Sequence, residues 1–163
     1  QLDQIRPQES LAALQCLDIS EYVQRIALNL LDGQIHLHRE HLWQELDKLV
    51  KAEDILICSY ALDGHPDHEA VGKTVQAFAQ AHDISYLHVL IWAWHWARPL
   101  DPRIHWQKAR AYNLTQAQLI NKRQDSMQFK SQIEADESTG NAAILSPAII
   151  ERLLMPWEVY LCE

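Results

Sequence analysis

Two histidines and two aspartates lie within the six residues 63–68, which read Asp-Gly-His-Pro-Asp-His. Imidazole and carboxylate groups bind metals and move protons, and His65 and His68, three residues apart, would project from the same side of a helix. A metal ligand must be neutral imidazole, the form that a helix N-terminus favours. The pattern indicates a metal or acid–base site. The alternative is that His65 and Asp67 only cap a helix and that His68 is a surface residue.

The neighbouring residues predict a strand, a turn and a helix that position this stretch. Residues 54–60 contain a short, mostly β-branched apolar run, typical of a strand buried on both faces of a parallel sheet. Asp63-Gly64 predicts a turn, with His65 at the helix N-cap, Pro66 at the first helical position and the helix running to His82. This unit would place the histidines at the carboxyl end of a parallel strand, where open α/β sheets bind ligands.

Residues 63–72, Asp-Gly-His-Pro-Asp-His-Glu-Ala-Val-Gly, resemble the second signature of the PIG-L or LmbE-like zinc-dependent de-N-acetylases. Arg6-Pro-Gln-Glu9 resembles the Arg-x-x-Glu helix of that family, and Leu31-Asp32-Gly33 resembles its Leu-Pro-Asp-Gly turn. Further segments are similar to a bacterial branch of the family, namely Trp94 to Pro99, Lys122, Ser131-Gln132 and Pro156 to Glu158. The resemblance covers nearly the whole chain.

The resemblance implies a role for each matching residue. His68 would bind zinc, His65 would stabilise the tetrahedral oxyanion or protonate the leaving amine, and Asp67 would orient His65. Arg6 and Asp32 match positions that hydrogen-bond sugar hydroxyls. The implied activity is hydrolysis of an N-acetyl group on N-acetylglucosamine in a larger glycoconjugate, with zinc as cofactor, although other divalent metals would suit the same ligands.

Members of this family also carry a first signature, His-Pro-Asp-Asp-Glu, which supplies two of the three zinc ligands and the general base. The sequence contains no such segment and begins with Gln1, so we expect an N-terminal βαβ portion to be missing from it. The chain by itself should then hold one zinc ligand of three, bind zinc weakly and show no turnover.

Residues 85–97 predict a further strand, with the tryptophans of this segment on one face and His95 on the other. We expect His95 and Arg98 to line the substrate cleft, because strand ends on the same edge of a sheet converge there. The tryptophans suit either a sugar-stacking platform or a buried core, and His95 could equally be a hydrogen-bonded core residue.

The rest of the chain predicts one α/β domain over residues 1–163, a Rossmann-like three-layer sandwich with a mainly parallel sheet. Helices are expected over residues 8–17, 36–51, 115–132 and 147–154, and strands over 22–30 and 157–162. Residues 101–113 and 134–141 are expected to be irregular. Gly72 inside the 66–82 helix would cost about 1 kcal/mol relative to alanine, so we expect a close contact there between helix and sheet.

Composition narrows the classes of partner. The formal net charge of -8 argues against nucleic acid and anionic membranes, and the longest apolar stretch, 89–94, is too short to span a bilayer. Cys16, Cys58 and Cys162 lie far apart and predict buried thiols in a reducing compartment rather than disulfides or a zinc cluster. We expect a cytoplasmic protein with a small-molecule or glycoconjugate substrate. The sequence leaves open whether it forms a homo-oligomer.

Two other functions stay open. A non-catalytic sugar-binding or scaffold relative, which has lost the first metal signature, would keep Arg6 and Asp32 for sugar recognition. A nucleotide-binding domain is the weaker alternative, because the sequence has no Gly-x-Gly-x-x-Gly motif and no phosphate loop.

A second histidine cluster precedes the apolar stripe of the 36–51 helix. It consists of His36, His38 and His41. We interpret it as a solvated helix start rather than a metal site, because only Glu40 or Glu45 would lie at ligand spacing on the same face.

Overall fold

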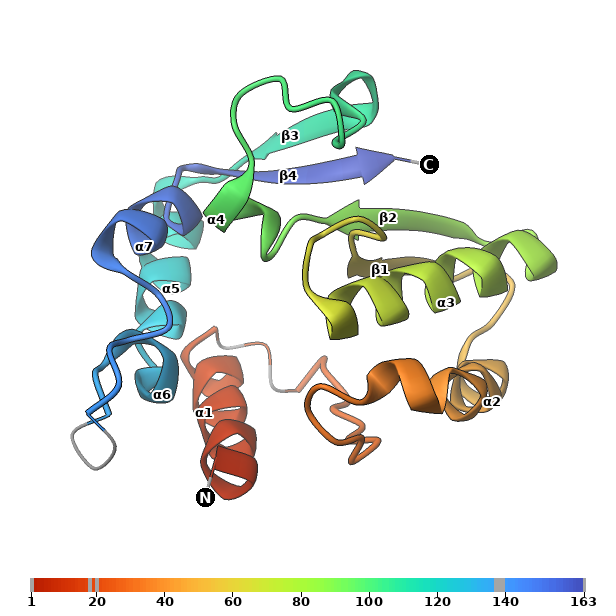
Figure 1. Ribbon diagram of the computed structural model, residues 1–163, viewed down its shortest axis with the longest axis horizontal. Coiled ribbons are helices and arrows are strands. Elements are labelled where there is room, and N and C mark those ends of the chain that lie inside the picture. Colours follow the sequence, from red (N-terminus) through yellow and green to blue (C-terminus); the bar gives the residue numbers. More distant parts are fainter. Residues whose placement is uncertain (1, 18, 20, 137–139, 163) are drawn as a thin grey trace. The chain divides into compact units, whose positions relative to one another are not determined.

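A computed structural model (Figure 1) describes residues 2–17, 19, 21–136 and 140–162. The chain forms two compact units. Unit 1 comprises residues 1–26 and 113–157, and unit 2 comprises residues 27–112 and 158–163. The sequence-based assignment of one domain to residues 1–163 stays a prediction.

Unit 1 contains helices joined by loops and turns. Its helices are α1 (Leu2–Cys16), α5 (Gln116–Ser126), α6 (Lys130–Ile133) and α7 (Pro147–Leu153). Helix α1 packs against α5 and α6. The buried carboxylate of Glu9 in α1 accepts hydrogen bonds from the backbone N–H and the hydroxyl of Ser131, each at 2.7 Å. These two bonds fix α1 to α6 although the two residues are far apart in the sequence.

Capping residues predicted the starts of two of these helices. Thr115 and Gln118 form the predicted capping box of α5, and Ser146 caps α7. The single helix predicted over 115–132 is wrong, because the N–H groups of residues 128 and 129 donate to carbonyls three residues back and end α5. Helix α1 begins at Leu2 and not at residue 8. Residues 137–139 of the predicted 134–141 loop lie outside the described residues.

Unit 2 holds the sheet and the helices around it. Its elements are η1 (Ile35–His38), α2 (Arg39–Leu49), β1 (Ile55–Ser59), α3 (Pro66–His82), β2 (Ser85–Val89), α4 (Ala93–Trp96), η2 (Trp106–Lys108), β3 (Ala109–Asn113) and β4 (Trp157–Cys162). The strand order is β1-β2-β4-β3, with β2 parallel to β1 and antiparallel to β4. The fold is therefore mixed α/β with an open sheet. The expected mainly parallel sheet is wrong, and the three-layer Rossmann-like arrangement stays a prediction.

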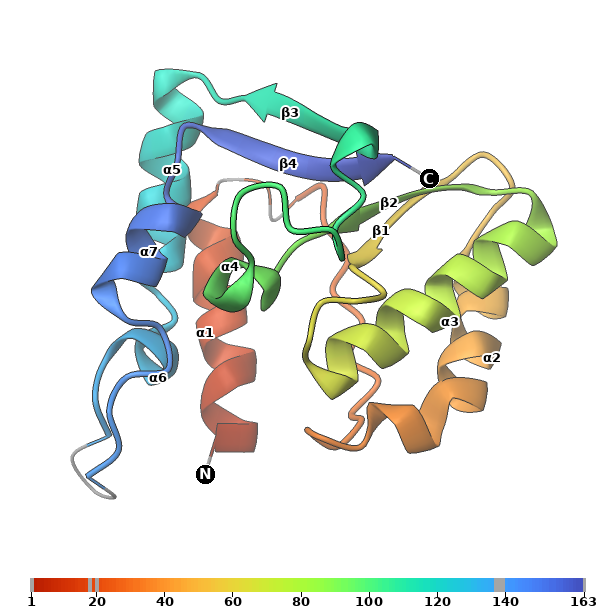
Figure 2. The same cartoon turned by 45° about the horizontal axis from the view of Figure 1, so that its top comes forward.

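Helix α3 lies between the β1–β2 pair and α2, as both views show (Figures 1 and 2). Its bounds are the predicted ones, and Phe78 and Ala79 are fully buried on its core face. Phe78 meets the ring of Trp43 from α2 edge to face, with 5.2 Å between centroids. The predicted close contact at Gly72 is confirmed, because a Cβ atom there would overlap the carbonyl oxygen of Ser59 at the end of β1.

Strand β1 occupies the predicted residues but is buried on one face only. Leu56 packs with Phe78, whereas Ile55 and Ile57 alternate with it and are 65% and 58% exposed. The strand lies at one end of the strand order. The prediction of burial on both faces is therefore wrong, since an apolar run alone does not distinguish a central strand from an edge strand.

Two other predicted strands do not form as expected. Residues 22–30 contain no strand; Tyr22 is 87% exposed, and Asn29 has a φ of 53°, which interrupts an extended chain. The 85–97 strand ends at Val89 and is followed by α4. Conversely, the segment 101–113, expected to be irregular, contains β3, which is hydrogen-bonded to β4.

The three cysteines are free thiols. Cys58 is buried, as predicted. Cys162 is exposed, so the prediction of buried thiols is wrong for that residue. Among the described residues, no helix is both long and apolar enough to cross a bilayer.

Candidate active site

The first turn of α3 carries the two histidines of the 63–68 stretch. His65 is the N-cap and Pro66 the first helical residue, as predicted. The Nδ1 atom of His65 accepts a hydrogen bond from the backbone N–H of Asp67 at 3.3 Å. An imidazole nitrogen that accepts a bond carries no proton, so neutral His65 has its proton on Nε2.

His68 lies beside His65 and is in the opposite tautomeric state. The two rings are 4.5 Å apart between centroids, which confirms that they share one side of the helix. Nδ1 of His68 lies 2.6 Å from Oδ2 of Asp63, a carboxylate that is fully buried. Because an ionised carboxylate only accepts, neutral His68 has its proton on Nδ1, which leaves the lone pair of Nε2 available.

Asp63 receives backbone donors as well as His68. The N–H groups of Ile91 and Ala93 bond to Oδ1, each at 3.0 Å, and that of Trp92 bonds to Oδ2 at 2.6 Å. Burial by itself would raise the pKa of Asp63, but the hydrogen bonds from His68 and from these N–H groups together hold it below its usual value. Asp63 is therefore ionised, and the same bonds turn the chain after β2 away from the predicted strand.

Residue-level reasoning missed Asp63, which the sequence indicates only as half of a turn dipeptide. Its spacing of five residues from His68, across a glycine, was the available signal. Gly64 has a φ of +85°, and a Cβ atom on it would lie 2.6 Å from Nε1 of Trp96. That Nε1 donates to the carbonyl of Asp63 at 2.8 Å, so α4 holds the turn through both the carboxylate and the backbone of Asp63.

Asp67 contacts His65 differently from the expectation. Its backbone N–H, rather than its carboxylate, bonds to His65. The buried carboxylate instead accepts the N–H groups of Gly33 at 2.5 Å and Ile35 at 3.1 Å. Asp67 therefore ties the turn of residues 31–35 to α3 and brings the exposed Asp32 next to the site.

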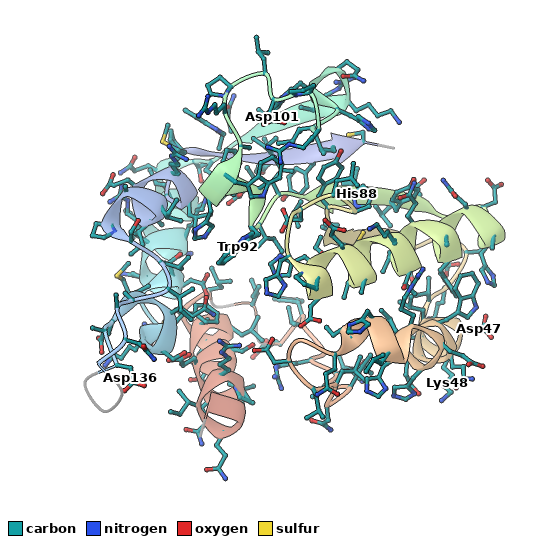
Figure 3. All side chains as sticks on the ribbon, viewed as in Figure 1. Asp47, Lys48, His88, Trp92, Asp101 and Asp136 are labelled. Atoms are coloured by element: carbon teal, nitrogen blue, oxygen red, sulfur yellow. The ribbon has the colours of Figure 1, made fainter. Side chains whose placement is uncertain are left out.

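The predicted alternation of residues 92–96 is wrong because these residues are helical. Instead of separating from its aromatic neighbours, His95 stacks on Trp92 with 4.1 Å between centroids and 21° between planes. Trp92 in turn meets His65 edge to face at 5.7 Å. Figure 3 labels Trp92, near the N-terminal end of α3. Since His95 covers one of its faces, Trp92 suits a support for His65 better than a platform for sugar.

The two predicted arginines lie on other segments than the first turn of α3. Arg98 follows α4 and is exposed. Arg6 belongs to α1 of unit 1. The structure thus brings His65, His68 and Asp67 together, with Asp32 nearby. His95 stacks on Trp92, which in turn contacts His65.

His68 has the environment of a metal-binding histidine. Nε2 of His68 accepts no hydrogen bond from the described residues, and its Nδ1 is held by a carboxylate, the usual arrangement of a metal-binding histidine. Among the described residues, no three His, Cys, Asp or Glu side chains lie close enough together to hold a metal ion. His36 and His41 are exposed, as expected for a solvated helix start.

A buried histidine and a hollow lie outside this site. His88, labelled on β2 in Figure 3, donates from Nδ1 to the carbonyl of Ser59 at 2.9 Å and lies 3.3 Å from the thiol of Cys58. Burial raises the pKa of Cys58 to about 12, so this thiol is not a nucleophile. A hollow of about 300 Å³ between α2 and α3 is lined by Arg39, Glu40, Trp43 and Thr74 and contains none of the predicted site residues.

Comparison with known proteins adds one finding. Residues 1–79 match the model of a protein family described as PIG-L, GlcNAc-PI de-N-acetylase. The matched part includes the whole 63–72 stretch, with the N-cap His65 and the contact between His68 and Asp63. No curated protein and no solved structure matches the chain.

Proposed function

Because residues 1–79 match the model of the PIG-L family of de-N-acetylases, we propose that the chain hydrolyses the N-acetyl group of an N-acetylglucosamine-containing glycoconjugate with zinc as cofactor. One observation carries the proposal. The two histidines on the first turn of α3 are in complementary states: His65 keeps an N–H donor on Nε2, and His68 keeps a lone pair on Nε2. Amide hydrolysis needs both a donor for the oxyanion and a ligand for the metal.

His68 would hold the metal through Nε2, while Asp63 fixes its ring from the other side. When bound, zinc supplies Lewis acidity for the amide carbonyl and makes water a better nucleophile. By the resemblance described above, two further ligands and the general base belong to a His-Pro-Asp-Asp-Glu signature. We therefore propose that the 163-residue chain contributes one ligand and part of the catalytic machinery, and that it needs this signature for turnover.

His65 would act as a neutral hydrogen-bond donor. The backbone N–H of Asp67 bonds to Nδ1, so the neutral ring carries its proton on Nε2. The Nε2–H group then stabilises the negative charge that develops on the carbonyl oxygen as water attacks. Of the two roles expected for His65, this geometry favours oxyanion stabilisation over protonation of the amine.

Substrate recognition would come from the residues around this pair. Asp67 holds Gly33 next to α3, which supports the proposal that the neighbouring Asp32 contacts a sugar hydroxyl. Arg6, His95 and Arg98 stay proposed substrate contacts. The free thiols suit a reducing compartment, which supports the proposed cytoplasmic location.

The test compares three single-histidine variants of the gene product that carries this chain. We expect His68→Ala to lose bound zinc and activity, and His65→Ala to keep zinc while its kcat falls roughly 100-fold or more. His36→Ala, a change at an exposed histidine, is the control and should alter neither zinc nor rate. Zinc is measured by elemental analysis, and activity by acetate released from N-acetylglucosamine derivatives.

If the protein binds about one zinc per chain but releases no acetate, the proposed hydrolase activity is wrong. In that case, binding of N-acetylglucosamine by the same protein would favour the non-catalytic sugar-binding relative. A sample whose intact mass matches the 163 residues should bind zinc weakly and release no acetate. Rapid turnover by such a sample would contradict the proposed need for the first signature.

A further inference from the structure

The carboxylate of Asp63 is surrounded by donors on every side. Oδ1 accepts the N–H groups of Ile91 and Ala93, and Oδ2 accepts that of Trp92 together with Nδ1 of His68. A backbone N–H can only donate, so both oxygens have to remain acceptors. Asp63 is also completely buried, which excludes water as a substitute partner.

This arrangement decides where His68 carries its proton. If the proton were on Nε2, the lone pair of Nδ1 would face an ionised carboxylate oxygen at 2.6 Å, which is repulsive. With the proton on Nδ1, the same contact is a short charge-assisted hydrogen bond. The three backbone donors thus act on His68 indirectly, because they keep Asp63 an acceptor.

We infer that Asp63 is a positioning residue that holds His68 in the Nδ1–H tautomer and so keeps the lone pair of Nε2 available for a ligand. The assignment of the His68 tautomer uses only contacts between residues of this chain and does not depend on any ligand. The identification of that ligand as zinc rests on the proposed function. The simpler alternative is that Asp63 only caps the turn into α4. In that case replacing Asp63 would lower the stability of the protein but leave the tautomer of His68 unchanged.

The Asp63→Asn variant distinguishes the positioning role of Asp63 from a role in capping the turn alone. Its amide has one oxygen and one NH2 group. In the place of Oδ1 the NH2 group would face two backbone donors, from Ile91 and Ala93, whereas in the place of Oδ2 it would face one, from Trp92. In the second placement His68 regains a partner by moving its proton to Nε2 and accepting at Nδ1. The variant therefore should switch the tautomer of His68.

The tautomer is read by long-range ¹H–¹⁵N NMR of the imidazole rings in metal-free protein, with His68 assigned by comparison with the His68→Ala variant. Wild-type protein should show a protonated Nδ1 and an unprotonated Nε2 at His68. A nuclear Overhauser effect between that Nδ1 proton and the amide proton of Trp92 should place both at Oδ2 of Asp63. In the Asp63→Asn variant the proton should appear on Nε2.

The matched control is Asp54→Asn. Asp54 also accepts a backbone N–H, that of Lys51 at 2.9 Å, but contacts no histidine ring among the residues that the structure describes. This variant should keep the wild-type tautomer of His68. A titration with Zn²⁺ alone, followed at His68, should show affinity about 10-fold to 100-fold weaker in Asp63→Asn than in Asp54→Asn.

Each outcome decides the proposal. An Nε2–H tautomer in wild-type protein would overturn it, and this spectrum remains decisive if Asp63→Asn does not fold. An unchanged Nδ1–H tautomer in a folded Asp63→Asn variant would overturn it too and leave Asp63 a turn-capping residue. Because the readout uses neither metal nor substrate, a failed deacetylase assay with the predicted tautomers would refute the proposed function and not the role of Asp63.

Discussion

Gly64 is a residue of the site with little room for a side chain. It has a positive φ, and the nearest obstacle to a Cβ atom is Nε1 of Trp96, which is itself bonded to the carbonyl of Asp63. Gly33 also has a positive φ, +78°, but a Cβ atom there would meet nothing within 4 Å. The two glycines therefore separate the cost of backbone strain from the cost of crowding.

We predict that Gly33→Ala lowers the free energy of unfolding by about 1–2 kcal/mol, the cost of a left-handed backbone for an L residue. Gly64→Ala should lose roughly 1–2 kcal/mol more, because Trp96 has to move and its hydrogen bond is broken. Urea denaturation monitored by circular dichroism measures both values. Equal losses would show that Trp96 does not press on the turn.

Cys58 and Cys162 should differ sharply in reactivity. Because burial raises the pKa of Cys58 to about 12, only roughly one molecule in ten thousand carries the thiolate at pH 8. Cys162 is exposed. Iodoacetamide at pH 8 should therefore label Cys162 within minutes and leave Cys58 unmodified until urea is added, as read by peptide mass spectrometry. Labelling of both at similar rates in folded protein would contradict the buried environment of Cys58.

At the scale of single residues, the sequence predicts the contacts between residues that are close together along the chain. The N-cap at His65, Pro66 in the first turn and the proximity of the two histidines follow from helix geometry alone. The partners of Asp63 do not, because its donors come from residues 91–93. The contact between the carboxylate of Asp67 and residues 33–35 is equally non-local. Spacing along one segment carries no information about such bonds.

Among the elements, α3 and β1 are joined most closely at Gly72. A methyl group there would overlap the carbonyl of Ser59 and lie 2.9 Å from the backbone nitrogen of Ala61. These are backbone atoms of a strand end and cannot rotate away as a flexible side chain can. The helix can approach the strand this closely only because residue 72 has no side chain.

Helix propensity and packing make opposite predictions for Gly72→Ala. Propensity alone would stabilise the helix by about 1 kcal/mol. Overpacking against β1 should outweigh this gain and leave a net loss of roughly 1–3 kcal/mol. The control is Ala77→Gly, at an exposed position of the same helix, which should lose about 1 kcal/mol through propensity. A gain in stability for Gly72→Ala, measured by thermal and urea unfolding, would refute the tight contact.

Elements with strong local signals were predicted with nearly their observed bounds, as α3, α7 and β4 show. The errors are in segments whose structure depends on a distant partner. Residues 22–30 alternate like a strand but pair with no strand in the described part of the chain, and residues 91–93 leave the extended conformation to bond to Asp63. β3 was missed because its pairing with β4, far along the chain, supports it more than its own sequence does.

For the molecule as a whole, the pattern of expected strands and helices predicted the α/β class but not the arrangement of the sheet. Strand β4 comes from the end of the chain and pairs antiparallel with β2, which makes the sheet mixed. Nothing in the local pattern of residues 157–162 determines that direction. The division into two units also has no marker in the sequence, since each unit is assembled from separate parts of the chain.

The exposed face of β1 has a consequence for the behaviour of the protein in concentrated solution. Within the described part of the chain β1 pairs only with β2, so one row of its backbone N–H and C=O groups has no strand beside it, and Ile55 and Ile57 lie on its uncovered face. Edge strands of this kind pair with strands of other molecules. Samples of the 163-residue chain should therefore scatter more light as their concentration rises.

Replacing Ile57 by lysine should suppress this association, because a charge on an edge strand opposes pairing. Leu37→Lys, at a residue of similar exposure on η1, is the control and should not suppress it. Static light scattering over a concentration series measures the effect, and equal slopes for both variants would contradict it. Shelf life and usable concentration would then be set by a single strand, whatever reaction the protein catalyses.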